Sequence, residues 1–150
     1  MNLIENKKIF LNYEVLEEYE AGLELFGAEV KMIKSRHGSL EGARVIIRGG
    51  EAYLVGANIP PYQPNNPSSQ YEADRTRKLL LSKKEINELI GRGEQKGLTI
   101  VPISMYNKNR LIKVRIAVVR GKKKYDKRES LKKKESRRDI ARDIKGTLKN

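Results

Sequence analysis

The sequence contains no cysteine and no tryptophan, and its single histidine is His37. Without cysteine the chain can form neither a disulfide framework nor a cysteine-ligated metal site. Long apolar runs are also missing: no segment approaches the roughly 20 residues that span a membrane, and the N-terminal segment is charged too early to hold the apolar core of a signal peptide. We therefore expect a soluble, cytoplasmic protein without a cofactor, a metal or a membrane partner.

Groups suited to catalysis are sparse. His37 lies in the polar turn Ser35–Ser39 with no second histidine to act beside it, so we interpret it as a surface residue or an RNA contact. Glu17, Glu18 and Glu20 form a carboxylate cluster, but nothing in the sequence separates their pKa values as acid–base chemistry requires. Such a carboxylate can accept hydrogen bonds from base amino groups, or it can line an exposed strand edge. We expect no enzyme; an RNA-processing nuclease is the competing hypothesis.

Positive charge is what the chain has in excess. It carries 32 Lys and Arg against 19 Asp and Glu, a formal net charge of +13. Such a charge repels itself in a compact state, and the usual reason to carry it is a polyanionic partner, with nucleic acid first. The composition therefore predicts an RNA-binding protein, of which a structural ribosomal protein is one alternative.

The excess charge is concentrated at the C-terminus. Residues 121–150 contain thirteen Lys and Arg and five Asp and Glu, a net +8, which leaves +5 for residues 1–120. The segment has few apolar residues and cannot bury enough surface to offset its ordering entropy. We expect one folded domain over residues 1–120 and a flexible basic tail over residues 121–150 that is disordered when free.

The tail also has features that suit RNA. Tyr125 lies between lysines and can stack on a base. Ile140, Ile144 and Leu148 recur every four residues, which places an apolar stripe on one side of a helix. Since basic segments of this kind commonly fold on RNA, we expect the tail to become helical there. A nonspecific solubilising extension is the alternative.

Two strand pairs are predicted in the first 120 residues. Arg44–Arg48 and Ala52–Ala57 flank Gly49-Gly50, which is a hairpin signal. Leu98–Met105 and Leu111–Val119 form a second pair around a turn-rich connection. These apolar, β-branched runs indicate a fold that is mainly β.

The remaining elements complete the predicted fold. Gly22 within the Tyr13–Leu25 strand indicates a bulge or a sharp bend. Helical spacing predicts a helix over Leu79–Leu89, ended by the glycines that follow it, and a shorter one over Ala28–Lys34. Pro60–Asp74 is predicted to be a long loop. About five strands with short helices fit a small closed β-barrel of the oligonucleotide-binding (OB) type.

A basic cluster precedes the predicted long helix. Arg75, Arg77 and Lys78 follow one another closely after Asp74. Because Arg can bind phosphate oxygens in a bidentate way, we interpret Arg75 and Arg77 as phosphate contacts. A solvated helix start is the alternative interpretation.

Several segments together resemble a known family. They are Asn6-Lys7-Lys8, Tyr19–Leu23, Glu29-Val30-Lys31, Gly50–Ile59, Arg75–Leu81 and Gly121–Arg128. In this order, over nearly the whole chain, they resemble the SmpB family, the SsrA-binding proteins of bacteria. The resemblance implies an OB-type barrel and agrees with the predicted fold.

The resemblance also implies a function. Members of the family bind the tRNA-like domain of transfer-messenger RNA (tmRNA, or SsrA RNA) and accompany it to stalled ribosomes for trans-translation, where the protein stands in place of the anticodon arm of a tRNA. The tail enters the decoding centre and the empty mRNA channel and becomes helical there. The expected partners are tmRNA and the stalled ribosome with its small-subunit RNA, not a small-molecule substrate, and the free protein is expected to be a monomer. The alternative is a general ribosomal RNA-binding protein.

Particular residues are implied as well. The expected tmRNA-binding residues are Asn6, Lys7, Glu20, Arg75, Arg77, Leu80 and Lys113. The expected ribosome-binding residues of the tail are Lys122, Lys123, Tyr125, Asp126, Lys127, Arg128, Ile140 and Ile144. Some members carry a histidine where this chain has Leu11, so a decoding-centre contact that needs that histidine is not expected here.

Overall fold

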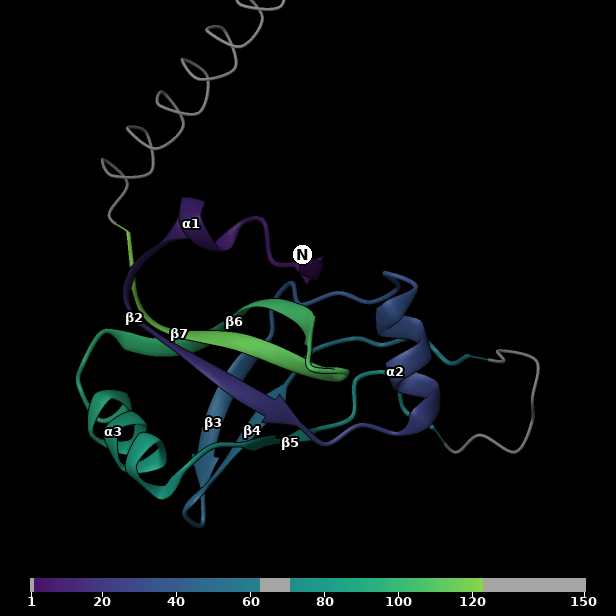
Figure 1. Ribbon diagram of the computed structural model, residues 1–150. Coiled ribbons are helices and arrows are strands. Elements are labelled where there is room, and N and C mark those ends of the chain that lie inside the picture. Colours follow the sequence, from purple (N-terminus) through teal and green to yellow (C-terminus); the bar gives the residue numbers. More distant parts are fainter. Residues whose placement is uncertain (1, 63–70, 123–150) are drawn as a thin grey trace, which may run out of the picture.

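The computed structural model describes residues 2–62 and 71–122. Its elements, in chain order, are β1 (Asn2–Glu5), α1 (Ile9–Asn12), β2 (Tyr13–Leu23), α2 (Gly27–Lys34), β3 (Arg44–Arg48), β4 (Glu51–Val55), β5 (Arg77–Leu80), α3 (Lys83–Gly93), β6 (Leu98–Lys108) and β7 (Leu111–Gly121). The strands form one antiparallel sheet in the order β1-β6-β7-β2-β5-β4-β3. Helices α2 and α3 lie at opposite ends of the curved sheet (Figure 1). The prediction of a mainly β fold with short helices is confirmed.

Both predicted hairpins are present. β3 and β4 pair up to Arg48 and Glu51, and the two glycines between them have φ values of 59° and 76°, a left-handed conformation that glycine adopts without strain. β6 and β7 pair up to Lys108 and Leu111. Their connection is only Asn109 and Arg110, so these strands extend further than the sequence predicted.

The core lies on the inner side of the curved sheet. Ile33 of α2, Leu89 of α3 and Ile116 of β7 are fully buried there. A smaller cluster on the other side packs Ile9 of α1 against Val119 of β7. The alternation of buried and exposed residues along β2 and β7 thus separates the core from a solvent-facing surface.

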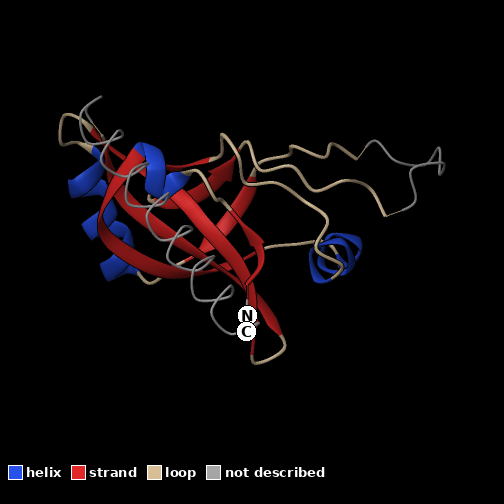
Figure 2. Cartoon of the chain, turned by 90° about the horizontal axis from the view of Figure 1, so that it is seen from above, coloured by secondary structure: helices blue, strands red, loops and turns tan. Residues whose placement is uncertain are grey.

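The predicted closure into a barrel is not confirmed. The sheet curves strongly (Figure 2), and β3 approaches β6, but the order of paired strands ends at β1 and β3. The sequence analysis missed β1, which pairs with β6 between Ser104 and Tyr106. Because β1 occupies that part of the free edge of β6, β3 cannot pair there, and the described sheet keeps two edges.

The predicted helix over Leu79–Leu89 is wrong at its start. Leu79 belongs to β5, where it pairs with Ala52 of β4 and Leu23 of β2. The helix begins after Ser82, whose side-chain oxygen accepts a hydrogen bond from the backbone N–H of Glu85 (3.2 Å), while the Glu85 carboxylate accepts one from the N–H of Ser82 (3.1 Å). This reciprocal capping box fixes the boundary, and α3 then runs through Gly91 to Gly93.

The first alternative predicted for Gly22, a bulge, is wrong. The pairing of β2 with β7 shifts register between Val15 and Glu17, whereas Gly22 pairs regularly.

The shorter predicted helix is confirmed as α2. Among the residues that the structure describes, no helix has the length and apolar character of a membrane span.

Candidate nucleic-acid interface

Three residues that are far apart in the sequence meet on the outer face of the sheet. Gly22 of β2 pairs with Lys113 of β7 on one side and with Leu80 of β5 on the other. Glu20 lies two positions before Gly22 and therefore on the same face of β2. We call Glu20, Gly22, Leu80 and Lys113 the Gly22 cluster. It contains three of the seven residues expected to bind tmRNA.

Gly22 allows the close approach of Leu80. A Cβ atom at position 22 would lie 3.1 Å from the Cβ of Leu80 and 3.3 Å from its Cδ1. Leu80 lies next to this gap and is 50% exposed, although it is a large apolar side chain. The glycine therefore allows the side chain of Leu80 to pack directly over β2.

Glu20 is fixed by two partners on β6. Its carboxylate accepts a hydrogen bond from the hydroxyl of Tyr106 and others from Nζ of Lys108, at 3.1 and 3.3 Å. The bond from Tyr106, followed by those from Lys108, holds the pKa of Glu20 below its ordinary value. Burial, together with this bond, raises the pKa of Tyr106 to about 12. At neutral pH the cluster thus presents an ionised, oriented carboxylate.

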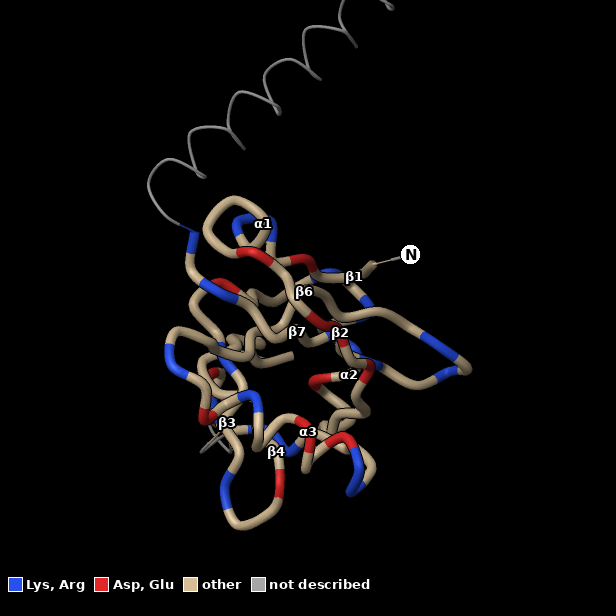
Figure 3. The backbone as a smooth tube through the Cα atoms, turned by 90° about the vertical axis from the view of Figure 1, so that its left-hand side faces the viewer, with Lys and Arg blue, Asp and Glu red and all other residues tan. Residues whose placement is uncertain are grey.

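Cations of β7 complete the face. Arg115 pairs in register with Glu20, forms an ion pair with Glu18 at 3.3 Å, and lies 5.5 Å from the ring centroid of Tyr106. The side chain of Lys113 makes no hydrogen bond or ion pair within the described residues, so its ammonium group can contact a phosphate. Lys and Arg positions are interspersed with Asp and Glu over the described residues (Figure 3). The described surface is therefore of mixed charge and not uniformly basic.

Asn6 is placed inside the protein. It is 6% exposed, and its side-chain amide donates to the carbonyls of Leu40 (3.1 Å) and Pro102 (3.2 Å). None of these contacts involves the Gly22 cluster. The position supports a role for Asn6 in fastening the N-terminal segment to β6; its neighbour Lys7 is exposed.

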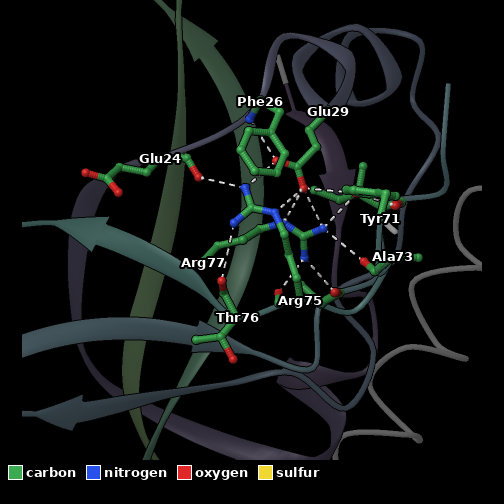
Figure 4. A network of polar contacts seen from close by, with 10 residues as sticks. Glu24, Phe26, Glu29, Tyr71, Ala73, Arg75, Thr76 and Arg77 are labelled. Atoms are coloured by element: carbon green, nitrogen blue, oxygen red, sulfur yellow. Dashed lines mark hydrogen bonds and ion pairs between the residues drawn. The ribbon is translucent and has the colours of Figure 1, made fainter. Parts of the chain in front are cut away.

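Arg77 is buried as well, so the interpretation of residues 75–78 as a solvated helix start is wrong. Its guanidinium forms an ion pair with Glu29 of α2 at 2.7 Å and donates to the carbonyl of Ala57 at 2.9 Å (Figure 4). Both charged side chains are at most 1% exposed. A phosphate cannot reach Arg77 in this conformation.

Glu29 is the centre of this buried network. It accepts hydrogen bonds from Tyr71, from Arg75 and from the backbone N–H of Phe26. Burial alone would raise the pKa of Glu29, but the bonds from Arg75, Phe26 and Arg77 outweigh burial and lower it. Sequence reasoning missed this role, because Tyr71, Arg75 and Arg77 lie more than forty residues further along the chain.

Lys122 is the only expected tail residue among those described. Its backbone N–H donates to the carbonyl of Asn12 at 2.9 Å, and its ammonium group donates to the carbonyl of Phe10 at 2.8 Å. Lys123, Tyr125 and the other expected tail residues lie outside the described residues. The described part also contains no group of three or more acidic or histidine side chains that could hold a metal ion.

Comparisons with known proteins agree with one another. The family model described as "SmpB protein" matches residues 3–146. The SsrA-binding protein of Gloeothece citriformis is 47% identical over 143 residues, which is 95% of this chain and 92% of that protein. The SsrA-binding protein of Thermosipho melanesiensis is 47% identical over 142 residues, 94% of this chain and 96% of that protein.

A solved structure is also similar. It is described as "tmRNA-SmpB: a journey to the center of the bacterial ribosome", and it shares 38% identity with a TM-score of 0.68 over 85% of this chain and 93% of that chain. The similarity thus extends from the sequence to the arrangement of the strands. The chain belongs to the SmpB family.

Proposed function

We propose that this protein binds tmRNA and delivers it to stalled ribosomes for trans-translation, with the protein in place of the tRNA anticodon arm. The observation that carries the proposal is family membership over nearly the whole chain. The names of the relatives and of the similar solved structure include SsrA, tmRNA and the bacterial ribosome. Such an adaptor acts in the cytoplasm, as a monomer, and catalyses no reaction of its own.

The Gly22 cluster is the proposed element of tmRNA recognition. The oriented carboxylate of Glu20 can accept hydrogen bonds from base amino groups, which lysines cannot. Lys113 supplies a phosphate contact, which positions the RNA without reading its sequence. Leu80 adds an exposed apolar contact beside them. Arg75 is 23% exposed and can join this surface, whereas Arg77 supports it from inside.

We further propose a division between body and tail. The body is an OB-type variant in which β1 occupies part of the edge that closure would need. The tail, with Lys123, Tyr125, Asp126, Lys127, Arg128, Ile140 and Ile144, acts on ribosomal RNA and becomes helical there. Because Lys122 bonds to Asn12, a truncation that tests this division should end after Lys122.

The experiment is a salt series of affinities for tmRNA and for bulk tRNA, with residues 1–150 and 1–122. We expect the short chain to keep its preference for tmRNA and to lose activity on stalled ribosomes. Lys113→Met should weaken binding and lower the salt slope by about one, while Lys84→Met, an exposed change on α3, should do neither. A full chain without preference for tmRNA would support a general ribosomal RNA-binding protein instead.

A further inference from the structure

An exposed aromatic ring, Phe26, lies four residues after Gly22 and has the guanidinium of Arg75 over one face. Phe26 precedes α2 and is 57% exposed. The guanidinium carbon of Arg75 lies 4.1 Å from the centroid of its ring, and Figure 4 shows the two groups facing each other. A single exposed apolar residue is ordinary, so the proposal depends on how this ring is held and where it lies.

The ring and the cation are held by the same buried carboxylate. The backbone N–H of Phe26 donates to Glu29 at 2.8 Å, and Nε of Arg75 donates to Glu29 at 3.1 Å. Arg75 also donates to the backbone carbonyl of Glu24 at 3.4 Å. A ring on a fixed backbone, backed by a fixed cation, loses little conformational entropy when it binds a partner.

Two chain segments lead from the Gly22 cluster to this ring. Phe26 follows Gly22 by four residues, and Arg75 precedes Leu80 by five. The two segments stay side by side, because the N–H of Glu24 donates to the carbonyl of Lys78 at 3.0 Å. The end of β2 and the start of β5 both approach α2 (Figure 1). The ring therefore continues the surface that is proposed to hold RNA.

We propose that Phe26, backed by Arg75, is a stacking site for an unpaired base of the RNA bound at the Gly22 cluster. Every base has a π face, so an exposed ring binds unpaired bases with little dependence on sequence, and proteins use such rings on single-stranded loops and ends. Arg75 adds positive charge close to the backbone of the same nucleotide. The inference rests on the proposed function, and it assigns to the segments that precede α2 and β5 a contact separate from Glu20 and Lys113.

The absence of tryptophan makes a direct test possible. In Phe26→Trp the indole is the only one in the chain, and stacking of a base on it changes its emission. The matched control is Phe10→Trp on α1, where the native ring is 55% exposed. Both variants are titrated with the tRNA-like domain of tmRNA. We expect the emission of Phe26→Trp to be quenched, with a titration curve that gives the dissociation constant of the complex. The emission of Phe10→Trp should stay unchanged. Unchanged emission of Phe26→Trp at saturation, or equal quenching of both, overturns the inference.

Affinity gives an independent measurement. Stacking contributes about 1–3 kcal/mol per base by alanine substitution, so Phe26→Ala should weaken binding roughly 5- to 150-fold, and Phe26→Leu should resemble it. Phe26→Tyr should bind like the native chain. Because stacking neutralises no phosphate, the salt slope of Phe26→Ala should equal that of the native chain.

The outcomes separate this inference from the proposed function. If the native chain does not prefer tmRNA, the proposed function fails. If it does prefer tmRNA, and Phe26→Ala binds equally well, only the stacking site fails. The substitution should leave folding intact, because the ring is exposed and the bond to Glu29 uses the backbone N–H of Phe26; thermal unfolding checks this.

Discussion

At the residue scale, Glu29 is a buried charge that joins α2 to β5 and to the segment before β5. It is 1% exposed, yet it forms ion pairs with both Arg75 and Arg77. Burying a charge is costly unless partners satisfy it, and here donors from the residue before α2, from β5 and from the segment before β5 surround one carboxylate. The network thus fixes the backbone of Phe26 and the start of β5, the strand that contains Leu80.

Replacing Glu29 should therefore be strongly destabilising. Glu29→Gln leaves the fully buried Arg77 without its counter-charge, and breaking a buried pair in this way typically costs about 3–5 kcal/mol. Glu41→Gln is the matched control, because its ion pair with Lys8 is exposed (3.1 Å) and contributes at most about 1 kcal/mol. Urea unfolding at pH 7 measures both, and equal effects would contradict the assignment.

The destabilisation caused by Glu29→Gln should depend on pH. The pKa of Glu29 is lowered by folding from an ordinary value of 4.5, so its stabilising contribution is fully present above that value and is lost as the pH falls through the folded pKa. The difference in unfolding free energy between the native chain and Glu29→Gln should shrink in acid. A difference that stays constant from pH 7 to pH 3 would be incompatible with an ionised Glu29.

Gly22→Ala should separate binding from stability. The added Cβ meets only the side chain of Leu80, which is half exposed and can move, so the free energy of unfolding should change by less than about 1 kcal/mol. Displacement of Leu80 should weaken tmRNA binding by about 1 kcal/mol, roughly fivefold. In Gly91→Ala on α3 the new Cβ meets nothing within 4 Å, so stability should rise by up to about 1 kcal/mol with affinity unchanged. Unfolding curves and gel shifts measure both quantities.

At the scale of elements, local sequence signals predict the hairpins, but the pairing of strands far apart in the sequence cannot be read from them. The glycine pair between β3 and β4 marks its hairpin in any context. The run Leu79–Leu81 is apolar and fits a helix or a strand equally well; pairing with β2 and β4 decides for a strand at Leu79 and Leu80. In the same way, the resemblance named Glu20, Leu80 and Lys113, but only the register of three strands shows that they meet around Gly22. Arg77 was interpreted as a phosphate contact because nothing near it in the sequence reveals Glu29.

The boundary between β5 and α3 is expected to depend on one hydroxyl group. Ser82→Ala removes the acceptor for the N–H of Glu85, and the loss of such a cap costs about 1 kcal/mol. Ser82→Asp keeps an acceptor at this position and should retain most of the stability. Thermal unfolding followed by circular dichroism compares the two; an alanine variant as stable as the native chain would show that packing of α3 alone sets its start.

At the scale of the whole molecule, the chain combines a mixed-charge body with a strongly basic terminus. The formal charge of +8 on residues 121–150 exceeds the +5 on residues 1–120, so nonspecific attraction to RNA should come mostly from the terminus, and selectivity from the body. Gly121 and Lys122, which composition assigns to the basic terminus, both bond to the body of the protein.

A truncation after Arg120 should therefore be less stable than one after Lys122. The shorter chain loses the pairing of Gly121 with Tyr13 and the bonds of Lys122 to Asn12 and Phe10. At about 1 kcal/mol net for each hydrogen bond, we expect a difference of roughly 1–3 kcal/mol in unfolding free energy. Identical denaturation midpoints would show that the two residues add nothing to the fold.

The Glu29 network has one more consequence, for protein engineering. Within it, Arg77 donates to the carbonyls of Ala57 and Ala73, and next to it the N–H of Ile59 donates to the carbonyl of Ala73 at 2.9 Å. Hydrogen bonds thus hold the residues just before position 60 next to those just after position 72. The free energy of closing a loop grows slowly with its length, by about 0.6 kcal/mol for each doubling. A short tag or a fluorophore-bearing peptide inserted between residues 63 and 70 should leave both the sheet and the proposed RNA surface undisturbed, which offers a position for a label away from either terminus.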